Sequence, residues 1–541
     1  MIPESGCTFV LSLMIALSGV GALEYDKRLN VAVFIVDDLR PEITTRYGQK
    51  QVITPNIDKL ISESMVFERA YCQQATCSPS RNSFLSGRRP HKTKTWNFIN
   101  HFREVGPDWV SFSQYFKEHN YTTLGVGKTY HGQKPPNEDQ PLSWSEDREY
   151  FDKGGKTKKC YMDFPGKDTS IVCPDKAKHL SHFTDYANLE VMLENLRYAN
   201  ARDSPFFLVY GIHKPHLPFH MPKEFWDEYP PTEEIDLPEH GHSPRDAPWL
   251  AHTYAMDGQR EIDVFGQTYK VPHPHSWNKP FPDNITRTLR KGYYASVSFV
   301  DFLVGEVLGE LDTLGRTNDT LVVLFGDHGW QLGEHGEWAK QTNFELATRV
   351  PLVFKVPGRA AGSTDALVEL VDVYPTVAAL AGLDAPVDLD GEDLSPHWNE
   401  SASPRRKEAA FSEFPRCPAN LTRPIQGNVP CSFTNREEFK AIGYSVRTED
   451  WRYTVWLPWN ATTLRGNFDS EPLGLELYSH IGDDGVDFNL FENVNKANDS
   501  DYSDLLDTMH ELAKNHWDSD GIIPSELPSP QPVKIVDSPN L

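Results

Sequence analysis

The feature that most constrains the fold is a set of short, continuously apolar runs rich in β-branched residues. They read NVAVFIVDD, SPFFLVYGIH, DTLVVLFGDHG and VPLVFKVPG, at residues 30–38, 204–213, 319–329 and 350–358. A strand that is apolar at every position is covered on both faces, which is typical of the parallel sheets of α/β proteins. The sequence therefore predicts a large, mostly parallel sheet flanked by helices.

Helical patterns separate these runs. Residues 54–64 start with Thr54 as an N-cap and a proline in the first turn, and their isoleucine and leucine side chains share one face. Residues 290–315 contain a long amphipathic pattern. Strands that alternate with helices favour an α/β architecture in which the carboxyl ends of the strands form the ligand site.

The sequence pattern of the chain changes near residue 432. IGYSVRTEDWRYTVWL predicts a hairpin that turns at TED, LGLELYSHIGDD predicts another strand, and SDLLDTMHELAKNHW predicts a closing helix. We therefore expect a large domain over residues 23–431 and a smaller α+β subdomain with an antiparallel sheet and an extended tail over 432–541. Residues 135–182 and 227–285, rich in proline, glycine and charge, read as long surface insertions.

The amino terminus has the pattern of a targeting signal. Residues 8–20 form an apolar run that is too short to span a bilayer and fits a signal-peptide core, which predicts a signal over residues 1–22. No later stretch is long and apolar enough to cross a membrane. Seven glycosylation sequons support passage through the secretory pathway. They are Asn120, Asn284, Asn318, Asn399, Asn420, Asn460 and Asn498.

The cysteines fit an oxidising compartment. Cys160 and Cys173 lie close together in the sequence, as do Cys417 and Cys431. Each pair predicts a local disulfide that stabilises a loop by about 3 kcal/mol on the chain-entropy model.

Two more cysteines lie close together around a short Pro/Ser/Arg segment, ATCSPSRNSF at residues 75–84. Cys72 and Cys77 can form a disulfide with each other, or Cys77 can stay free for chemistry. Spacing alone leaves both interpretations open.

The formal charge of −24 disfavours a broad face for nucleic acid or another polyanion, because such a surface repels the ligand. A small cationic pocket remains compatible with this charge, since local fields dominate at short range. We therefore expect no nucleic-acid partner. No feature of the sequence indicates an oligomeric state.

Acidic residues follow two of the predicted strands. Asp37 and Asp38 end the first, and Asp327 with His328 ends the third. Each acid alone could be a helix N-cap, but acids at two strand ends favour a shared cation. Oxygen ligands suit Ca²⁺ or Mg²⁺, and a flexible mixed set suits Ca²⁺ better, although an imidazole is more typical of softer metals.

Basic residues accompany the acids. GVGKTYHG contains Lys128 and His131, HKPH contains His213, and GEHGEWAK ends in Lys340. Each alone is an ordinary surface or buried side chain. Together with Arg81 they predict a pocket for a small tetrahedral anion beside a divalent cation.

The segment from Cys77 to Arg81, C-S-P-S-R, followed by Gly87 at the end of a short helix, resembles the signature of the type I sulfatases. This family belongs to the alkaline-phosphatase superfamily, and the resemblance implies its fold, with a smaller C-terminal subdomain. It also implies that a formylglycine-generating enzyme oxidises Cys77 to formylglycine in the endoplasmic reticulum, which leaves Cys72 unpaired. Ser86 stands where the family usually has threonine.

The resemblance also implies roles for the residues. The Ca²⁺ ligands would be Asp37, Asp38, Asp327, His328 and the modified Cys77. The catalytic set would be Cys77 as nucleophile, Arg81 to steady it, Lys128 and Lys340 on the sulfate oxygens, His131 on the hydrated aldehyde, and His213 on the sulfate and leaving oxygen. Trp330 would be a wall for the sugar ring. In an acidic lumen the histidines would be mostly protonated, given a reference pKa near 6.5.

Longer segments such as SPFFLVYGIHKPHLPF and GDHGWQLGEHGEWAKQTNFE resemble the lysosomal exo-acting branch of the family. That branch removes the 2-O-sulfate of terminal iduronate from heparan and dermatan sulfate, so we expect a sulfated glycosaminoglycan substrate and a lysosomal, or alternatively secreted, enzyme. Two alternatives remain open. One is an exo-sulfatase for another sulfated sugar, and the other is an inactive protein that binds sulfated glycans.

Overall fold

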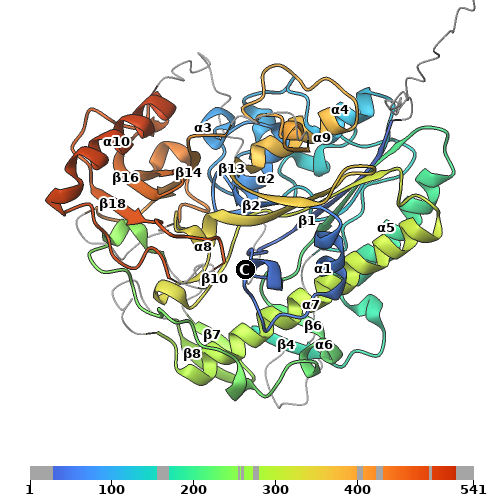
Figure 1. Cartoon of the computed structure of the whole chain (residues 1–541), viewed down its shortest axis with the longest axis horizontal. Helices are drawn as coiled ribbons and strands as arrows, with labels where there is room; N and C mark the ends of the chain where they lie inside the picture. The colour runs from blue at the N-terminus through green and yellow to red at the C-terminus, as the bar shows by residue number, and fades with distance from the viewer. Residues whose placement is uncertain are drawn as a thin grey trace, which may run out of the picture.

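The predicted apolar strands lie at the centre of a seven-stranded sheet (Figure 1). β1 (Asn30–Val36) is parallel to β9 (Thr320–Gly326) on one side and to β5 (Phe206–Ile212) on the other. Every residue of these three strands is buried. The computed structural model describes residues 28–154, 170–253, 256, 261–271, 280–398, 406–421, 430–486 and 490–518.

The sheet has the order β13-β2-β12-β9-β1-β5-β3. β3 (Thr122–Gly127) is parallel to β5, and β13 (Gly362–Glu369) is parallel to β2 (Met65–Tyr71). β12 (Arg349–Lys355), which is the fourth predicted strand, runs antiparallel to both β9 and β2. The mostly parallel α/β sheet is therefore confirmed, with one reversed strand inside it.

Helices cover both faces of this sheet (Figure 1), and each face has its own hydrophobic core. One face packs against α1 (Pro55–Ser62), α5 (Thr184–Asn200) and α7 (Asp283–Thr313). The other packs against α2 (Cys77–Ser86), α4 (Phe112–Glu118) and α9 (Val373–Leu380). The shorter elements are α3 (Pro90–Thr93), β4 (Val172–Asp175), β6 (Phe219–Pro222), α6 (Lys223–Asp227), β7 (Glu261–Val264), β8 (Gln267–Lys270), β10 (Gln331–Leu332), β11 (Trp338–Ala339) and α8 (Glu345–Thr348).

The start of α1 differs from its prediction. Thr54 makes no side-chain cap, and its hydroxyl donates instead to the carbonyl oxygen of Ile43 at 2.7 Å. The carboxylate of Asp301 on α7 accepts the backbone N–H groups of Asn56 and Ile57, at 3.2 and 2.7 Å. A side chain from a packed neighbour therefore satisfies the free N–H groups that a local cap would otherwise take.

The C-terminal subdomain has the expected hairpin, strand and helix, drawn in orange and red in Figure 1. β15 (Ala441–Arg447) and β16 (Trp451–Asn460) are antiparallel and turn at Thr448–Asp450. β16 also pairs with β17 (Arg465–Gly466) and β18 (Gly474–Ser479), and α10 (Ser503–Asp518) packs on the sheet. β14 (Ala410–Arg416) pairs with β15, so this sheet begins before the predicted boundary at residue 432.

A buried ion network joins the subdomain to the main sheet. Glu345 on α8 accepts from Arg447 of β15 at 3.1 Å and from Arg452 of β16. Burial raises the pKa of Glu345, but Arg447 and Arg452 outweigh this and hold it well below its usual value.

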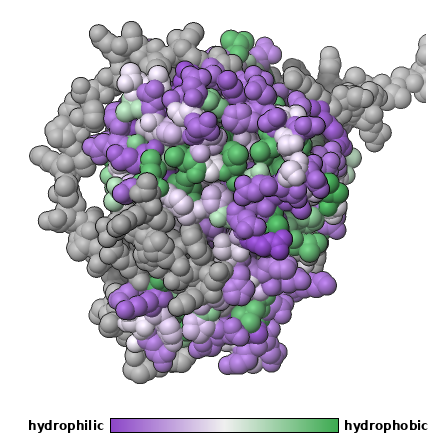
Figure 2. Space-filling view, turned by 90° about the vertical axis from the view of Figure 1, so that its left-hand side faces the viewer, coloured by the Kyte–Doolittle hydropathy of each residue, from purple (hydrophilic) through white to green (hydrophobic). Residues whose placement is uncertain are grey.

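The side of the molecule that carries the C-terminal subdomain faces the viewer in Figure 2. Its surface is mostly hydrophilic, with some apolar side chains among the polar ones.

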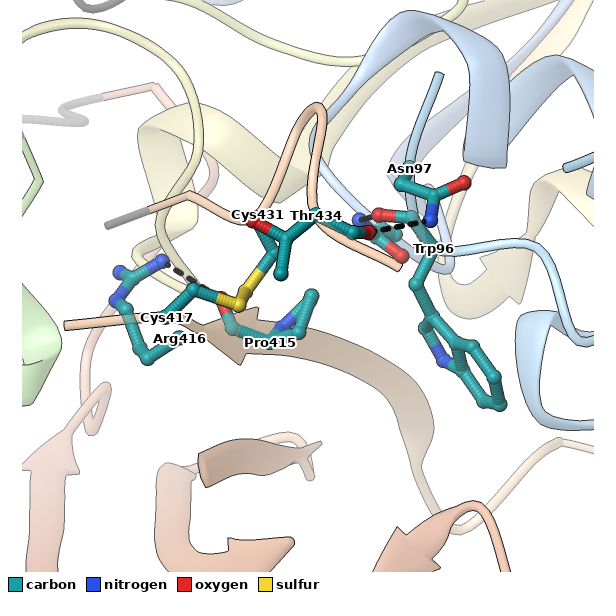
Figure 3. Close-up of a disulfide and its surroundings, with 8 residues drawn as sticks. Trp96, Asn97, Pro415, Arg416, Cys417, Cys431 and Thr434 are labelled. Atoms are coloured by element: carbon teal, nitrogen blue, oxygen red, sulfur yellow. Dashed lines mark hydrogen bonds between the residues drawn. A yellow bond between two sulfur atoms is a disulfide. The ribbon is translucent and has the colours of Figure 1, made fainter. Parts of the chain in front are cut away.

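The cysteines follow most of the predicted scheme. Cys417 and Cys431 form a disulfide beside the loop that carries Thr434 (Figure 3). Cys173 is also disulfide-bonded, whereas its predicted partner Cys160 lies outside the described residues. Cys72 and Cys77 are both free and buried, which excludes a disulfide between them in this structure.

Removing the disulfide between Cys417 and Cys431 should lower the stability of the protein. A variant with Cys417→Ser and Cys431→Ser opens a loop of sequence separation 14, and we expect it to lose about 3 kcal/mol. Calorimetry should show a melting temperature several degrees below that of the wild type. An unchanged melting temperature would show that hydrogen bonds alone hold this loop.

The predicted sequons are accessible where the structure describes them. Asn120, Asn284, Asn318, Asn420 and Asn498 are exposed and Asn460 is half-buried, while Asn399 and the predicted signal at 1–22 lie outside the described residues. Among the described residues, no helix combines the length and apolar character that a membrane span requires. Glycosylation stays a prediction.

Candidate active site

The register of the sheet explains why polar residues gather at one edge. Val36 at the end of β1 lies beside Gly326 of β9 and Ile212 of β5. Because the three strands are parallel, their following residues start at the same edge. Asp37 and Asp327 therefore meet although they are far apart in the sequence, as the strand-end argument predicts.

Two glycines let Lys128 reach this edge. A Cβ on Gly211 would lie 2.1 Å from the backbone carbonyl carbon of Lys128. Gly127 has a φ of 73°, and a Cβ there would lie 2.1 Å from the carbonyl oxygen of Gly211. Any larger residue at either position would push β3 away from β5 and move Lys128 out of the site.

Cys77 is the first residue of α2 and is almost fully buried, with 1% of its surface exposed. Its Sγ lies 3.2 Å from Nζ of Lys340 and 3.4 Å from Nε2 of His328. Burial, followed by the negative charge of Asp37, raises the pKa of the Cys77 thiol to about 11. The unmodified side chain is therefore a neutral thiol and a poor nucleophile.

The acidic residues form a cluster that fits a divalent cation. Asp37, Asp38 and Asp327 are fully buried, and ligand atoms of Asp37, Cys77, Asp327 and His328 lie within 4.8 Å of one another. Oδ2 of Asp38 is buried and has no hydrogen-bond partner among the described residues. An unpartnered buried carboxylate oxygen beside two further carboxylates is the donor set of a hard cation.

His328 is oriented as a ligand. Its Nδ1 lies 3.0 Å from the carbonyl oxygen of Gly329, so this nitrogen carries the proton and donates it. Its Nε2 faces the cluster, at 3.4 Å from Asp327 and 3.5 Å from Asp38. This hydrogen bond fixes the tautomer whose free lone pair points at the cation position.

Three cations offset the three carboxylates. Arg81, one turn after Cys77, contacts Asp327 at 3.0 Å and Asp37 at 3.4 Å. Lys128 contacts Asp37, and Lys340 contacts Asp38. Burial raises the pKa of Asp37, but Lys128 and its other positive neighbours outweigh it and hold that pKa well below the usual value. Burial raises the pKa of Asp38 well above its usual value, although Lys340 opposes the shift.

The HKPH segment brings a second histidine, His216, to the acidic cluster, and the role predicted for His213 stays a prediction. Nε2 of His213 lies 2.9 Å from Asp152, outside the acidic cluster. The chain turns after β5, with the N–H of His216 donating to the carbonyl oxygen of His213 at 3.0 Å. A ring nitrogen of His216 then lies within 4.8 Å of ligand atoms of Asp37, Asp38 and Cys77. The prolines of this segment indicate a turn, but the sequence does not show which histidine the turn brings to the cluster.

His131 and His216 are less basic than the sequence argument assumed. Burial, and then the positive charge of Lys128, lowers the pKa of His131 well below its usual value. Burial, and then Lys340, does the same to His216. The expectation that acidic conditions would protonate the site histidines therefore does not hold for His131 in the free protein, and His216 behaves in the same way. The reason is that an imidazolium here would be dry and next to an ammonium group.

Trp330 does not form an open wall. None of its surface is exposed, and Nζ of Lys340 lies 5.3 Å from the centre of its ring. The indole thus supports Lys340 from below, through a cation–π contact, instead of presenting a face to a sugar.

The comparisons with known proteins agree with this geometry. Residues 30–383 match the model of the sulfatase family, and residues 333–454 match the model described as N-sulphoglucosamine sulphohydrolase, C-terminal. The chain therefore belongs to the sulfatase family and is a sulfuric ester hydrolase. This family implies a formylglycine and a divalent metal, and Cys77 with its carboxylate cluster fits both.

Two relatives are similar over almost their whole length. The chain is 37% identical to the iduronate 2-sulfatase of Mus musculus, covering 93% of this chain and 96% of the relative. It is also 37% identical to the iduronate 2-sulfatase of Homo sapiens, covering 88% and 92%.

Solved structures support the fold alone. A 2-O GAG sulfatase aligns with a TM-score of 0.66 and 19% identity over 91% of this chain and 92% of that one. The phosphonate monoester hydrolase of Agrobacterium radiobacter aligns with a TM-score of 0.69 and 18% identity, over 92% and 96%.

Proposed function

We propose that this sulfatase hydrolyses the 2-O-sulfate ester of iduronate at the non-reducing end of heparan and dermatan sulfate. The observation that carries the proposal is the buried set of Cys77, three carboxylates and two lysines, within a chain 37% identical to iduronate 2-sulfatases. An exo-acting enzyme needs only the terminal sugar, so its small cationic pocket is compatible with a formal charge of −24.

We further propose calcium as the ion, held by Asp37, Asp38, Asp327 and His328. Carboxylate oxygens in a flexible mixed set favour Ca²⁺ over the stricter octahedral Mg²⁺. The ion would supply positive charge that polarises the sulfate ester. A formylglycine at Cys77 would supply a hydrated aldehyde, whose two hydroxyl groups on one carbon allow attack on sulfur and later release of sulfate.

The remaining chemistry belongs to the chain's own residues. Lys128 and Lys340 bring two ammonium groups to the place where sulfate oxygens gain charge. Arg81 holds Asp37 and Asp327 in register with Cys77. His216 is the described imidazole that comes within 4.8 Å of Cys77 from the HKPH turn, which favours it as the acid that protonates the leaving sugar oxygen. Because its pKa is lowered in the free protein, this role requires the negative charge of the bound sulfate ester to favour the protonated ring.

His216 and His213 give a matched pair of variants. We expect His216→Ala to lower kcat about 100-fold or more on a sugar sulfate, since general acid catalysis contributes roughly 10²–10⁴. The loss should be small on an aryl sulfate, whose leaving oxygen needs no proton. His213→Ala should have the smaller effect on the sugar sulfate, because His213 pairs with Asp152. Equal losses in both variants would contradict this assignment.

The substrate is tested with a panel of disaccharides that differ only at the sulfated non-reducing sugar. Release of sulfate from 2-O-sulfated iduronate, at a rate well above that from 2-O-sulfated glucuronate or 6-O-sulfated glucosamine, supports the proposal. Preference for another terminus would support the alternative, an exo-sulfatase for a different sugar. Binding without release would support the inactive glycan-binding protein.

We propose a lysosomal location, with modification of Cys77 by the formylglycine-generating enzyme on the way. The exposed sequons Asn120, Asn284 and Asn318 support transit through the endoplasmic reticulum, where this modification takes place. Secretion is the alternative. Imaging of the tagged full chain against a lysosomal marker, with assay of the medium, separates the two.

A further inference from the structure

A line of aromatic rings leads from the site to the surface. Phe98 stacks on His131 with centroids 4.6 Å apart and ring planes 12° apart. Phe433 lies 5.6 Å from Phe98 on the outer side, with 59% of its surface exposed. We call Phe98 and Phe433 the aromatic rim.

The backbone holds the rim on both sides of Phe433. The N–H of Phe98 donates to the carbonyl oxygen of Ser432 at 2.9 Å, and Nδ2 of Asn97 donates to that of Thr434 at 2.9 Å. The disulfide at Cys431 ties the same loop to the end of β14 (Figure 3). Part of the phenyl ring of Phe433 stays in water, although covering it with a ligand would be favourable. This arrangement favours a ligand that covers the ring.

A lysine is hydrogen-bonded through its backbone to His131, the histidine on which Phe98 stacks. Lys134 follows His131 across a tight turn, its N–H donating to the carbonyl oxygen of His131 at 2.8 Å, and its side chain is half-exposed. Within the described residues its ammonium group has no ion pair. Burial and then the charge of Lys134 lower the pKa of His101 to about 4, so this charge reaches the segment that carries Phe98. Glu104, a carboxylate close enough to feel the charge of Lys134, forms its ion pair with Arg436 at 3.6 Å.

We propose that the aromatic rim binds the second sugar of the substrate, the one that follows the sulfated terminal residue, and that Lys134 faces an anionic group on it. This rests on the proposed function, because it takes a glycosaminoglycan as the ligand. The apolar C–H face of a pyranose packs on an aromatic ring, while its sulfate or carboxylate groups project from the edge. A ring beside a lysine therefore selects an anionic sugar, such as an N-sulfated hexosamine.

Two substrates with the same 2-O-sulfated terminal uronate test the rim. One is its methyl glycoside, and the other is its disaccharide with an N-sulfated hexosamine. With the full-length, modified enzyme, Phe433→Ala should lower the ratio of kcat/KM for the disaccharide over the methyl glycoside about tenfold, mainly through KM. Phe433→Trp should keep the ratio. Lys134→Gln should lower it and weaken its dependence on salt.

The control is Val387→Ala, at a fully exposed apolar residue, which should leave the ratio as in the wild type. If the wild type turns over both substrates but Phe433→Ala has the same ratio of kcat/KM as the wild type, the subsite is overturned. The proposed function then remains intact. If the wild type hydrolyses neither substrate, the proposed function fails and calorimetry with the disaccharide decides. Weaker binding by Phe433→Ala than by the wild type then supports the subsite, and equal binding overturns it.

Discussion

Replacing Cys77 by alanine is expected to remove sulfate release almost completely, by about 10⁴-fold or more, because the variant loses the nucleophile itself. The fold should persist, since the truncation removes one buried sulfur atom from a helix that the other residues still hold, at a cost of about 1 kcal/mol. Ion chromatography of released sulfate and calorimetry of the same sample measure the two effects. Near-native activity would refute the nucleophile assignment.

Cys72→Ala is the matched control, because Cys72 is also a free, buried thiol and lies five residues away. Its Sγ contacts only the carbonyl oxygen of Ala347 at 4.0 Å among the hydrogen-bond partners described. We expect this variant to keep its activity. Equal loss in both variants would indicate that packing, and not chemistry, explains the Cys77 result.

Cys77→Ser separates the thiol from the aldehyde. A serine that accepted the sulfuryl group has no second hydroxyl on the same carbon to expel it, so this variant should stop after one turnover. Mass spectrometry of the wild-type peptide should show an aldehyde at residue 77. The conversion of Cys77 to the aldehyde is needed because burial and Asp37 keep the unmodified thiol protonated, with a pKa of about 11.

The central strands could be predicted because each is apolar throughout and therefore buried on both faces. β1, β5 and β9 follow this rule, and β12 follows it between its terminal residues Arg349 and Lys355. β3 contains two glycines and β2 carries charged residues, so neither has that signature. The reversal of β12 depends on the path of the chain between strands, about which the composition of a strand says nothing.

The site shows the same division. Asp37 and Asp327 were predictable because parallel strands end at one edge, and the register confirms that they meet. The approach of His216 to the cluster was not predictable, because it depends on how a turn of four residues returns to the cluster. Trp330 lies beneath Lys340, and only packing reveals which face of a tryptophan is covered.

Asp38→Asn is expected to remove most of the stabilisation that calcium gives. The substitution keeps the shape of the side chain and removes the charge of a carboxylate whose Oδ2 has no other partner in the described structure. A protein at 100 times its calcium Kd gains about 2.7 kcal/mol, and a 100-fold weaker site would retain only about 0.4 kcal/mol. Turnover should fall with it, by at least about 100-fold, since even outer-shell changes cost 10–100-fold.

The readout for Asp38 is the rise in melting temperature on adding calcium to chelator-treated protein. Asp372→Asn is the control, because Asp372 is equally buried and its pKa is also raised by burial, but it pairs with Lys407 away from the cluster. That variant can lose stability, yet its rise on adding calcium should match the wild type. If calcium raises the melting temperature of Asp38→Asn as much as that of the wild type, Asp38 is not a ligand of the metal. If magnesium raises the melting temperature of the wild type more than calcium does, magnesium replaces calcium as the proposed ion. The same carboxylates would then favour the smaller cation.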